Sequence, residues 1–455
     1  MERKLESSMG DYLAHLVVDI GKRPISGEDL TSVRQHMLDA LASAFIGCRS
    51  NAFETLKELC PPVEGGIPGP AGGAHPRSMP DGALLWAYAI NASVFEDGSR
   101  EGACHPAAAV IPAVISLSSG ANWEDIDRAV VAGYEVMVRM ARGGNPEFTA
   151  RGFHPTSIVA PFGAAASAAI LSGFDHYRIC NALCIAAMAS SGLMSSFKAG
   201  ETQPLQVAWA VRGGVTAALL AGEGHEGYRY ILEEGFYPAY LGHAPDPPLG
   251  RDFQYGYAIR GSYLKPYPGC RHLHPAIDAF GKIWEENDLV SEDIESVTVW
   301  TYRVAVDTEI HDLNSRGDAY FNIPYALSAR AILGQCDYHA FDEKNFKNEK
   351  IVALMKKIRV RVDPELDERY PEERGAIVEI TMKSRGRYTM EVTHPLGEPE
   401  NPLPLSVTRQ KFRSLARDFL AESTMGRIEK ILDDPEPGES PGELFASLGE
   451  NVNDG

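Results

Sequence analysis

The chain has 455 residues, of which 44% are hydrophobic and 23% charged, and its formal net charge is −19. A chain of this length exceeds what one hydrophobic core usually supports, so we expect two domains or one large domain with an insertion. The negative charge repels nucleic acid and anionic membranes, which excludes non-specific binding to either, and an anionic substrate would require a local positive pocket.

The cysteines and the apolar segments bear on the compartment. The seven cysteines include no CxxC pair, and the first residues contain no apolar signal stretch, so we expect reduced thiols in the cytoplasm. The most apolar stretches, residues 158–173 and 205–222, are rich in Ala and Gly, and Gln206 and Arg212 interrupt the second. Both are therefore predicted to be packed helices and not membrane spans.

The first part of the chain has a helical pattern. Apolar residues recur near the helical period over residues 31–48. Further Ala-rich helical stretches follow at residues 81–94, 107–117, 123–142, 158–172, 177–188 and 205–221. Small residues let helices pack closely, which predicts a compact helical bundle. Residues 65–80 form a Gly/Pro-rich loop without the Lys-Ser/Thr ending of a phosphate loop, so phosphate binding is not expected there.

The pattern changes after Gly261. Residues 296–304, 358–362 and 377–392 alternate apolar and polar side chains, and the last run is interrupted at residues 384–386, which suits a hairpin turn. Helical stretches at residues 275–286 and 325–333 lie between these strands, and residues 407–432 are helical again. The fold class is therefore predicted as mainly α, with an α+β domain at residues 261–399 inserted into a helical domain of residues 1–260 and 400–455.

Three local clusters combine histidine with carboxylate, lysine or tyrosine side chains. They are Phe95-Glu96-Asp97 with His105-Pro106, Arg151-Gly152-Phe153-His154-Pro155-Thr156, and Lys265-Pro266-Tyr267-Pro268 with His272 and His274. Histidine transfers protons near neutral pH, lysine holds a carboxylate or an enolate oxygen, and a carboxylate orients either group. Together these residues fit proton abstraction next to a carboxylate, although a histidine before proline is also a common helix-capping loop residue.

Other site types have weaker support in the sequence. The run His272-x-His274 leads into Pro275 and a helix, so we do not expect a metal there. The one Gly-x-Ser-x-Gly run, residues 438–442, does not follow a predicted strand as a nucleophile elbow would, and the sequence has no dinucleotide fingerprint after a strand and no basic stripe with interleaved aromatic residues. Ordinary hydrolase, dehydrogenase and nucleic-acid-binding interpretations therefore lose support.

These clusters, in this order, resemble the MmgE/PrpD family, which includes 2-methylcitrate dehydratase, cis-aconitate decarboxylase and iminodisuccinate epimerase. The resemblance covers nearly the whole chain. The matching segments are residues 39–47, Gly133-Tyr134-Glu135-Val136 with Arg139, residues 151–156, residues 213–227, Lys265-Pro266-Tyr267-Pro268, Phe321-Asn322-Ile323-Pro324-Tyr325 and residues 394–402.

The resemblance implies a large all-helical domain, an α+β lid, a homodimer, and an active-site cleft between the domains without a cofactor or a metal. It assigns His105, His154, Lys265, His274 and Tyr325 to the active site. We expect His154 and His105 to exchange protons, Lys265 and His274 to hold the carboxylate or its enolate, and Tyr325 to donate to a leaving group. Asp97 is expected to orient His105 or to bind a substrate hydroxyl, and His272, Thr156 and Gln203 are predicted to bind substrate.

The sequence departs from the family pattern at three places. The family stretch Asp-Phe-Asp-Asp is Val94-Phe95-Glu96-Asp97 here, and Gln203 and Gln206 stand where related members have lysine and histidine. Glutamine still donates hydrogen bonds, but it lacks the charge-assisted contact of an ammonium group with a carboxylate. Lys198 is a candidate substitute, although a solvated loop lysine is the simpler interpretation.

Three functions are therefore in question, and all concern a small carboxylate-bearing molecule. The first is a cofactor-independent lyase, a dehydratase or a decarboxylase, that acts on a hydroxy- or unsaturated polycarboxylate through a carboxylate-stabilised carbanion. The second is an isomerase or epimerase of a related amino- or imino-dicarboxylate. The third is a non-catalytic carboxylate-binding or scaffold homologue, which would not need to keep His154, Lys265 and Tyr325 together.

Overall fold

The structure is a computed structural model, and it describes residues 8–70, 76–245, 249, 252–384, 386–436 and 438–448. Part of the Gly/Pro-rich loop, residues 71–75, lies outside the described residues. The chain forms two compact units, Met1–Leu264 together with Pro404–Gly455, and Lys265–Leu403. The sequence boundaries proposed for the inserted domain are residues 261 and 399.

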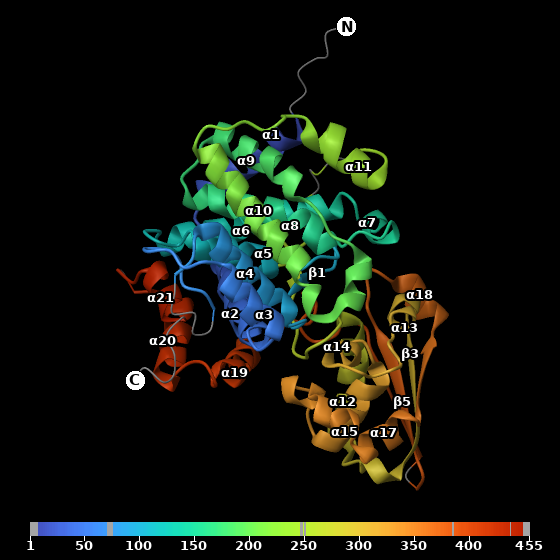
Figure 1. The fold of residues 1–455 in the computed structure, drawn as a ribbon. Coiled ribbons are helices and arrows are strands. Elements are labelled where there is room, and N and C mark those ends of the chain that lie inside the picture. The colour runs from blue at the N-terminus through green and yellow to red at the C-terminus, as the bar shows by residue number, and fades with distance from the viewer. Residues whose placement is uncertain are drawn as a thin grey trace. The chain divides into compact units, whose positions relative to one another are not determined.

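The first unit is built almost entirely from helices (Figure 1). Its α-helices are α1 (Met9–Gly21), α2 (Gly27–Gly47), α3 (Asn51–Leu59), α4 (Met79–Ala92), α5 (Ala107–Ser116), α6 (Trp123–Arg142), α7 (Glu147–Ala150), α8 (Pro155–Leu171), α9 (His176–Ala186), α10 (Leu205–Gly222), α11 (Tyr237–Leu241), α19 (Leu405–Ala416), α20 (Glu422–Asp433) and α21 (Pro441–Ser447). Short helical turns are η1 (Ala187–Ala189), η2 (Met194–Thr202) and η3 (Leu232–Phe236), and the strands β1 (Gly98–Ser99) and β2 (Ser262–Tyr263) pair antiparallel.

Close approach of α6, α8 and α10 forms the centre of this unit, and small residues permit it. A Cβ atom on Gly133 of α6 would lie 2.2 Å from Ser167 Oγ of α8. A Cβ on Gly214 of α10 would lie 2.3 Å from the Pro161 carbonyl oxygen of α8. Real Cβ atoms do not approach that closely, so these two glycines set the spacing of the helices that carry the site residues described below.

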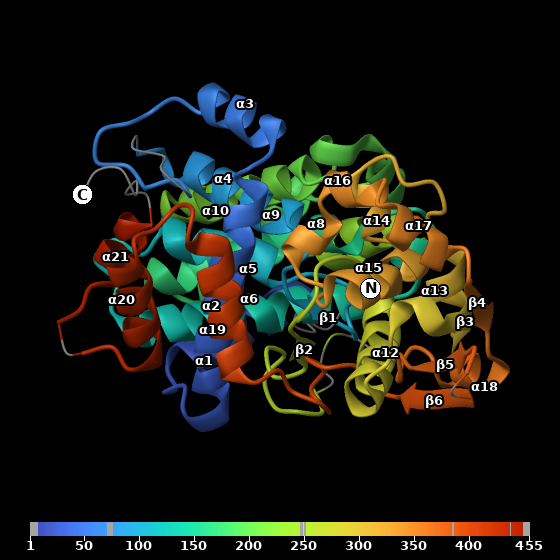
Figure 2. The ribbon, with the colours of Figure 1, turned by 90° about the horizontal axis from the view of Figure 1, so that it is seen from below.

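The C-terminal segment belongs to the first unit. Helix α19 packs along α2, as Figure 2 shows, and α20 also contacts α2. Lys411 on α19 and Asp39 on α2 form a buried ion pair of 2.6 Å. Phe419, just after α19, packs against Phe45 of α2 with ring centroids 5.3 Å apart.

One described helix, α10, is long and apolar enough to cross a membrane by length and composition alone. It packs against α4, α8 and α9, and 56% of its apolar window is buried within the structure. Core helices of globular proteins pass the same test, so α10 is described here as a bundle helix.

The second unit contains a four-stranded sheet with the order β4-β3-β5-β6. Its strands are β3 (Ile294–Thr301), β4 (Ile358–Val362), β5 (Ala376–Met382) and β6 (Gly386–Val392), and only the β3–β4 pair is parallel. Val297 pairs with Ile380 and Val299 with Val378, and all four side chains are buried. Because side chains alternate across a strand, these residues define the covered face of the sheet.

Helices cover that sheet and close the unit. Helix α12 (His274–Asn287) contacts β5 and β6, and α15 (Ile323–Leu333) contacts α12, β4 and α17 (Glu349–Met355). The shorter helical segments are η4 (Arg271–Leu273), η5 (Ser291–Asp293), α13 (Arg303–Asp307), α14 (Arg316–Ala319), η6 (Tyr338–Phe341), α16 (Glu343–Phe346) and α18 (Pro364–Arg369). The predicted fold class, mainly α with a smaller α+β domain, is confirmed.

Candidate active site

His105 lies on the loop between β1 and α5 in the first unit. Its ring Nδ1 contacts the main-chain carbonyl of Asp97, and its main-chain N–H donates to Thr156 Oγ1 at 3.2 Å. Glu96 Oε1 lies 3.8 Å from the same Nδ1. The side chain keeps 26% of its surface exposed, so the ring is anchored through Nδ1 and remains partly accessible.

The Asp97 carboxylate anchors this loop. It accepts hydrogen bonds from His36 Nδ1 at 2.9 Å, from the Tyr134 hydroxyl at 2.8 Å and from the Ala107 main-chain N–H at 3.0 Å. Its side chain is fully buried. The main-chain carbonyl of Asp97 contacts the His105 ring, whereas the carboxylate bonds to α2, α5 and α6. The role of Asp97 in orienting His105 or binding a substrate hydroxyl stays a prediction.

The loop that carries Asp97 and His105 is held in an uncommon backbone conformation. Val94 and Ala103 have φ angles of 50° and 48°, in the left-handed region. A β-branched residue such as valine rarely adopts this region, whereas aspartate and asparagine tolerate it. This backbone strain lies next to the proposed chemistry, as strained residues often do.

Lys411 fixes the same loop from the C-terminal segment. Its Nζ donates to the Phe95 carbonyl and to Asp39 Oδ1, both at 2.6 Å, and lies 3.7 Å from the Phe95 ring centroid. Burial raises the pKa of Asp39, and the Lys411 ammonium group opposes that rise. A buried carboxylate of this kind requires its cation.

His154 is the N-cap residue of α8, and its main-chain N–H donates to the Gly192 carbonyl at 3.2 Å. Gln206 Nε2 lies 3.0 Å from its ring Nδ1, and the Phe197 ring meets the imidazole edge-on at 5.1 Å. Only 5% of His154 is exposed. Burial, with a smaller contribution from nearby His105, lowers the pKa of His154 to about 3, so this imidazole is neutral near pH 7.

The predicted substrate-binding residues of the first unit lie close to this pair. Thr156 is completely buried on the first turn of α8, where its hydroxyl oxygen accepts from the His105 main chain. Gln203 is 9% exposed and directly precedes Pro204 and α10. Lys198 lies on η2 and is exposed. The first unit thus brings together His105, His154 and Thr156.

In the second unit, Lys265 and His274 are almost completely buried, with exposed fractions of 1% and 0%. Arg271 Nη1 donates to His274 Nδ1 at 2.9 Å, and Arg271 also pairs with buried Glu398 at 3.0 Å. The Tyr267 ring meets His274 edge-on at 5.4 Å. His274 at the start of α12 is thus oriented by an arginine that a carboxylate holds in place.

Tyr325 and His272, two predicted site residues of the second unit, are hydrogen-bonded to protein groups. The Tyr325 hydroxyl donates to the Ala340 carbonyl at 2.6 Å, and the side chain is buried against Phe341. In this structure the hydroxyl proton bonds to the main chain, and the role of Tyr325 as a donor to a leaving group or a bound oxygen stays a prediction. His272 Nδ1 lies 2.6 Å from the Tyr302 hydroxyl, and burial lowers its pKa to about 3.

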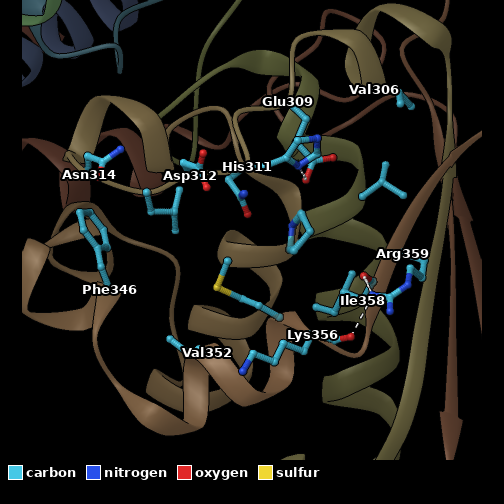
Figure 3. Close-up of a pocket in the computed structure, with 15 residues that line it drawn as sticks. Val306, Glu309, His311, Asp312, Asn314, Phe346, Val352, Lys356, Ile358 and Arg359 are labelled. Atoms are coloured by element: carbon cyan, nitrogen blue, oxygen red, sulfur yellow. Dashed lines mark hydrogen bonds and ion pairs between the residues drawn. The ribbon is translucent and has the colours of Figure 1, made fainter.

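A cavity of about 910 Å³ lies elsewhere in the second unit (Figure 3). Figure 3 shows Glu309 and His311 side by side, with Lys356 lying away from them. His311 Nδ1 lies 3.7 Å from Glu309 Oε1. The Arg359 guanidinium at the cavity donates to the carbonyls of Lys356 and Ile358. No predicted site residue lines this cavity, and among the described residues no three His, Cys, Asp or Glu side chains gather as metal ligands.

Several contact residues around the histidine pair were absent from the predicted site. Gln206 was noted only as a departure from the family pattern, yet it is the hydrogen-bond partner of His154. His36 and Tyr134, which hold Asp97, lie on helices far from it in sequence. The sequence marked both helices as apolar and periodic, but it contained no signal that they meet at residue 97.

Comparison with known proteins gives the affiliation of the chain. Residues 11–248 match the MmgE/PrpD N-terminal domain and residues 267–434 match the MmgE/PrpD C-terminal domain. Human cis-aconitate decarboxylase is 24% identical over 423 residues, which cover 88% of this chain and 86% of that protein. The cis-aconitate decarboxylase of Aspergillus terreus is 24% identical over 463 residues, covering 94% and 93%.

A third relative is the cis-aconitate decarboxylase-like protein oryM of Aspergillus oryzae, 22% identical over 481 residues that cover 97% of this chain and 98% of that protein. Both halves of the sequence therefore match the two domains of one family, in the family's order. The chain belongs to the MmgE/PrpD family.

Proposed function

We propose that this protein is a lyase of the decarboxylase or dehydratase type, acting on a small hydroxy- or unsaturated polycarboxylate through a carbanion that the adjacent carboxylate stabilises. The observation that carries the proposal is the pair formed by partly exposed His105 and buried His154 in the first unit, joined through Thr156. Membership of a family whose similar members are cis-aconitate decarboxylases supports the lyase chemistry.

The chemistry requires one group that moves a proton and another that stabilises negative charge. Histidine moves protons near neutral pH, and preorganised hydrogen-bond donors stabilise a developing enolate. We assign these tasks to the two histidines of the first unit. In the second unit we propose that Lys265 and His274 bind a substrate carboxylate, since an ammonium group and an imidazole suit that anion.

We further propose that the reaction uses no metal and no nucleotide, and that the enzyme works in the cytoplasm. The histidine pair and the carboxylate-stabilised carbanion account for the chemistry without either. All seven cysteines are free thiols, which suits a reducing compartment. Exhaustive chelation is expected to leave turnover unchanged, and restoration of lost turnover by a divalent ion would contradict the cofactor-free proposal.

The second candidate is an isomerase or epimerase of a related dicarboxylate, which would use the same carbanion but return the proton to the other face. Gln203 and Gln206, neutral where related members have lysine and histidine, favour a substrate that differs from the usual tricarboxylates. The third candidate, a non-catalytic homologue, predicts binding without chemistry.

The experiment that tests the proposal is incubation of the full chain in heavy water with a panel of small di- and tricarboxylates. We expect deuterium at the acidic carbon of one substrate, together with release of CO2 or loss of water. Exchange with inversion, and neither CO2 release nor water loss, would favour the isomerase. Binding of a carboxylate without exchange or product would contradict catalysis and support the non-catalytic homologue.

A further inference from the structure

The orientation of the Gln206 side-chain amide is fixed by a donor on the main chain. The Leu193 main-chain N–H points at one end of the amide, at 2.9 Å, and an N–H group can only donate. The amide atom facing it must be the oxygen, Oε1. The other end, which lies against His154 and Ser196, is therefore the NH2 group.

That NH2 group uses both of its hydrogens. It lies 3.0 Å from His154 Nδ1 and 2.7 Å from Ser196 Oγ, and Ser196 Oγ donates its own proton to the Leu193 carbonyl at 2.7 Å. His154 Nδ1 must therefore accept, and the proton of this neutral imidazole lies on Nε2. Burial keeps this imidazole neutral near pH 7, so the ring carries a single proton.

His105 has the opposite arrangement. Its Nδ1 contacts the Asp97 carbonyl oxygen, which can only accept, so Nδ1 carries a proton. In the neutral ring the lone pair is then on Nε2. Glu96 Oε1 lies 3.8 Å from His105 Nδ1, and the two imidazole rings lie near each other. The Asp97 carboxylate is bonded to His36, Tyr134 and Ala107.

We propose that the two histidines have fixed and opposite tautomers, so that His105 is the base and His154 is a neutral hydrogen-bond donor, with Gln206 as the positioning residue that sets the tautomer of His154. The catalytic part rests on the proposed function. In dehydration and in solvent exchange, the substrate C–H proton moves to His105 Nε2, which forms an imidazolium that keeps its Nδ1 proton. The C–H electron pair moves into the enolate of the adjacent carboxylate, and His154 Nε2–H donates to the oxygen where charge develops.

This assignment gives the departure at residue 206 a function. An amide with its oxygen held by a main-chain N–H can present only a donor to His154. A histidine at residue 206 could present a donor or an acceptor according to its own tautomer. Glutamine therefore fixes His154 as a donor, and the role of base is left to His105.

The first test determines the histidine tautomers by NMR spectroscopy in the absence of substrate. The full chain is labelled with 15N-histidine, and long-range proton–nitrogen correlation separates protonated from unprotonated ring nitrogens. His105→Asn and His154→Asn identify the two sets of signals. We expect Nε2–H for His154 and Nδ1–H for His105 at pH 7.5, and Nδ1–H on His154 would overturn the proposal.

Gln206→Glu tests the positioning role. Its carboxylate only accepts, so His154 is expected to carry a proton on Nδ1 and to gain positive charge, with its pKa raised. Gln254→Glu, at an exposed position of the same unit, adds the same charge as a matched control and should leave the tautomers unchanged. If Gln206→Glu does not fold, Gln206→Ala is expected to give a mixture of His154 tautomers. Unchanged His154 signals in either folded variant would overturn the role of Gln206.

Deuterium exchange separates the two catalytic roles. His105→Gln is expected to slow exchange at the acidic carbon by at least about a hundredfold, because the base is lost. His154→Gln keeps an N–H donor at similar reach and is expected to slow exchange by about tenfold. A larger loss in His154→Gln than in His105→Gln would overturn the division of roles. If no carboxylate of the panel reacts with the wild-type protein, the proposed function fails. The nitrogen spectra still test the proposed tautomers, because they require no substrate.

Discussion

Because His154 is buried, its contribution to folding stability depends on pH in a way that the contribution of an exposed histidine does not. Its pKa is lowered to about 3 in the folded chain, against about 6.5 in an unfolded one. Below pH 6.5 the unfolded chain binds a proton that the folded chain does not, so this residue lowers stability as the pH falls from 6.5 towards 3. At pH 5 the loss amounts to about 2 kcal/mol.

Urea unfolding at pH 7.5 and pH 5.0 measures this effect. Between pH 7.5 and pH 5.0, the His154→Gln protein should lose about 2 kcal/mol less stability than the wild-type chain loses. His311→Gln serves as the control, because His311 has 81% of its side chain exposed and should not alter the dependence. Equal pH dependence in His154→Gln and the wild type would contradict the prediction.

For single residues, the sequence indicated which residue types form the site better than it indicated their hydrogen-bond partners. The two histidines were chosen from local motifs, and Thr156 followed from its neighbour His154. The hydrogen bonds that decide their chemistry come from distant residues, as in Tyr134 with Asp97 or Ala340 with Tyr325. Local motifs contain no information about such pairs, so they indicate residues of the site without the hydrogen-bond partners of those residues.

Helix α19 contributes to the stability of the first unit through the buried ammonium group of Lys411. Lys411→Met would leave Asp39 buried and without its ammonium partner, which is expected to cost about 3–5 kcal/mol of unfolding free energy. Lys430→Met, on the exposed surface of α20, removes an ion pair with Glu436 and should change stability by less than about 1 kcal/mol.

Denaturant unfolding of a double variant distinguishes charge from packing. Asp39→Leu combined with Lys411→Met removes both charges, so it is expected to recover most of the loss. If the double variant were no more stable than Lys411→Met alone, the cost would not arise from the unpaired carboxylate.

The elements themselves were well predicted where periodicity is long. Helix α6 has the predicted bounds, and the predicted hairpin at residues 377–392 is present as β5 and β6. The helical region predicted over residues 407–432 is present as two helices, α19 and α20, and Leu420 between them is buried. Helix α1 was not predicted, although Ser8 and Asp11 form a capping box at its start.

Association of two copies is the prediction for the whole molecule. Several large apolar side chains near the first half of α10 are exposed, and they are Met188 (71%), Leu193 (55%), Phe197 (42%) and Trp209 (55%). Leu193 bonds to Gln206, and Gly213 lies against Ala189, so these segments adjoin α10. Apolar groups that cluster on a surface mark an interface, and we expect this one to pair with itself in a homodimer.

Light scattering should therefore give about twice the chain mass of 49.6 kDa at micromolar concentration. Trp209→Arg is expected to shift the population towards the monomer. Val290→Arg, at an exposed apolar position of the second unit, should not. A monomeric wild-type protein, or a Trp209→Arg protein that stays dimeric to the same extent, would contradict an interface at α10.

The division of the first unit into two stretches of sequence has a consequence for synthesis. Its bundle lacks α19 to α21 until after Lys265–Leu403 has been translated. At about 5–20 residues per second, that second unit takes roughly 7–28 s to emerge. During this interval Asp39 and the apolar side of α2 have no Lys411 and no α19 to cover them. The nascent chain is therefore expected to present this strip to chaperones, and to complete its first unit only after its second.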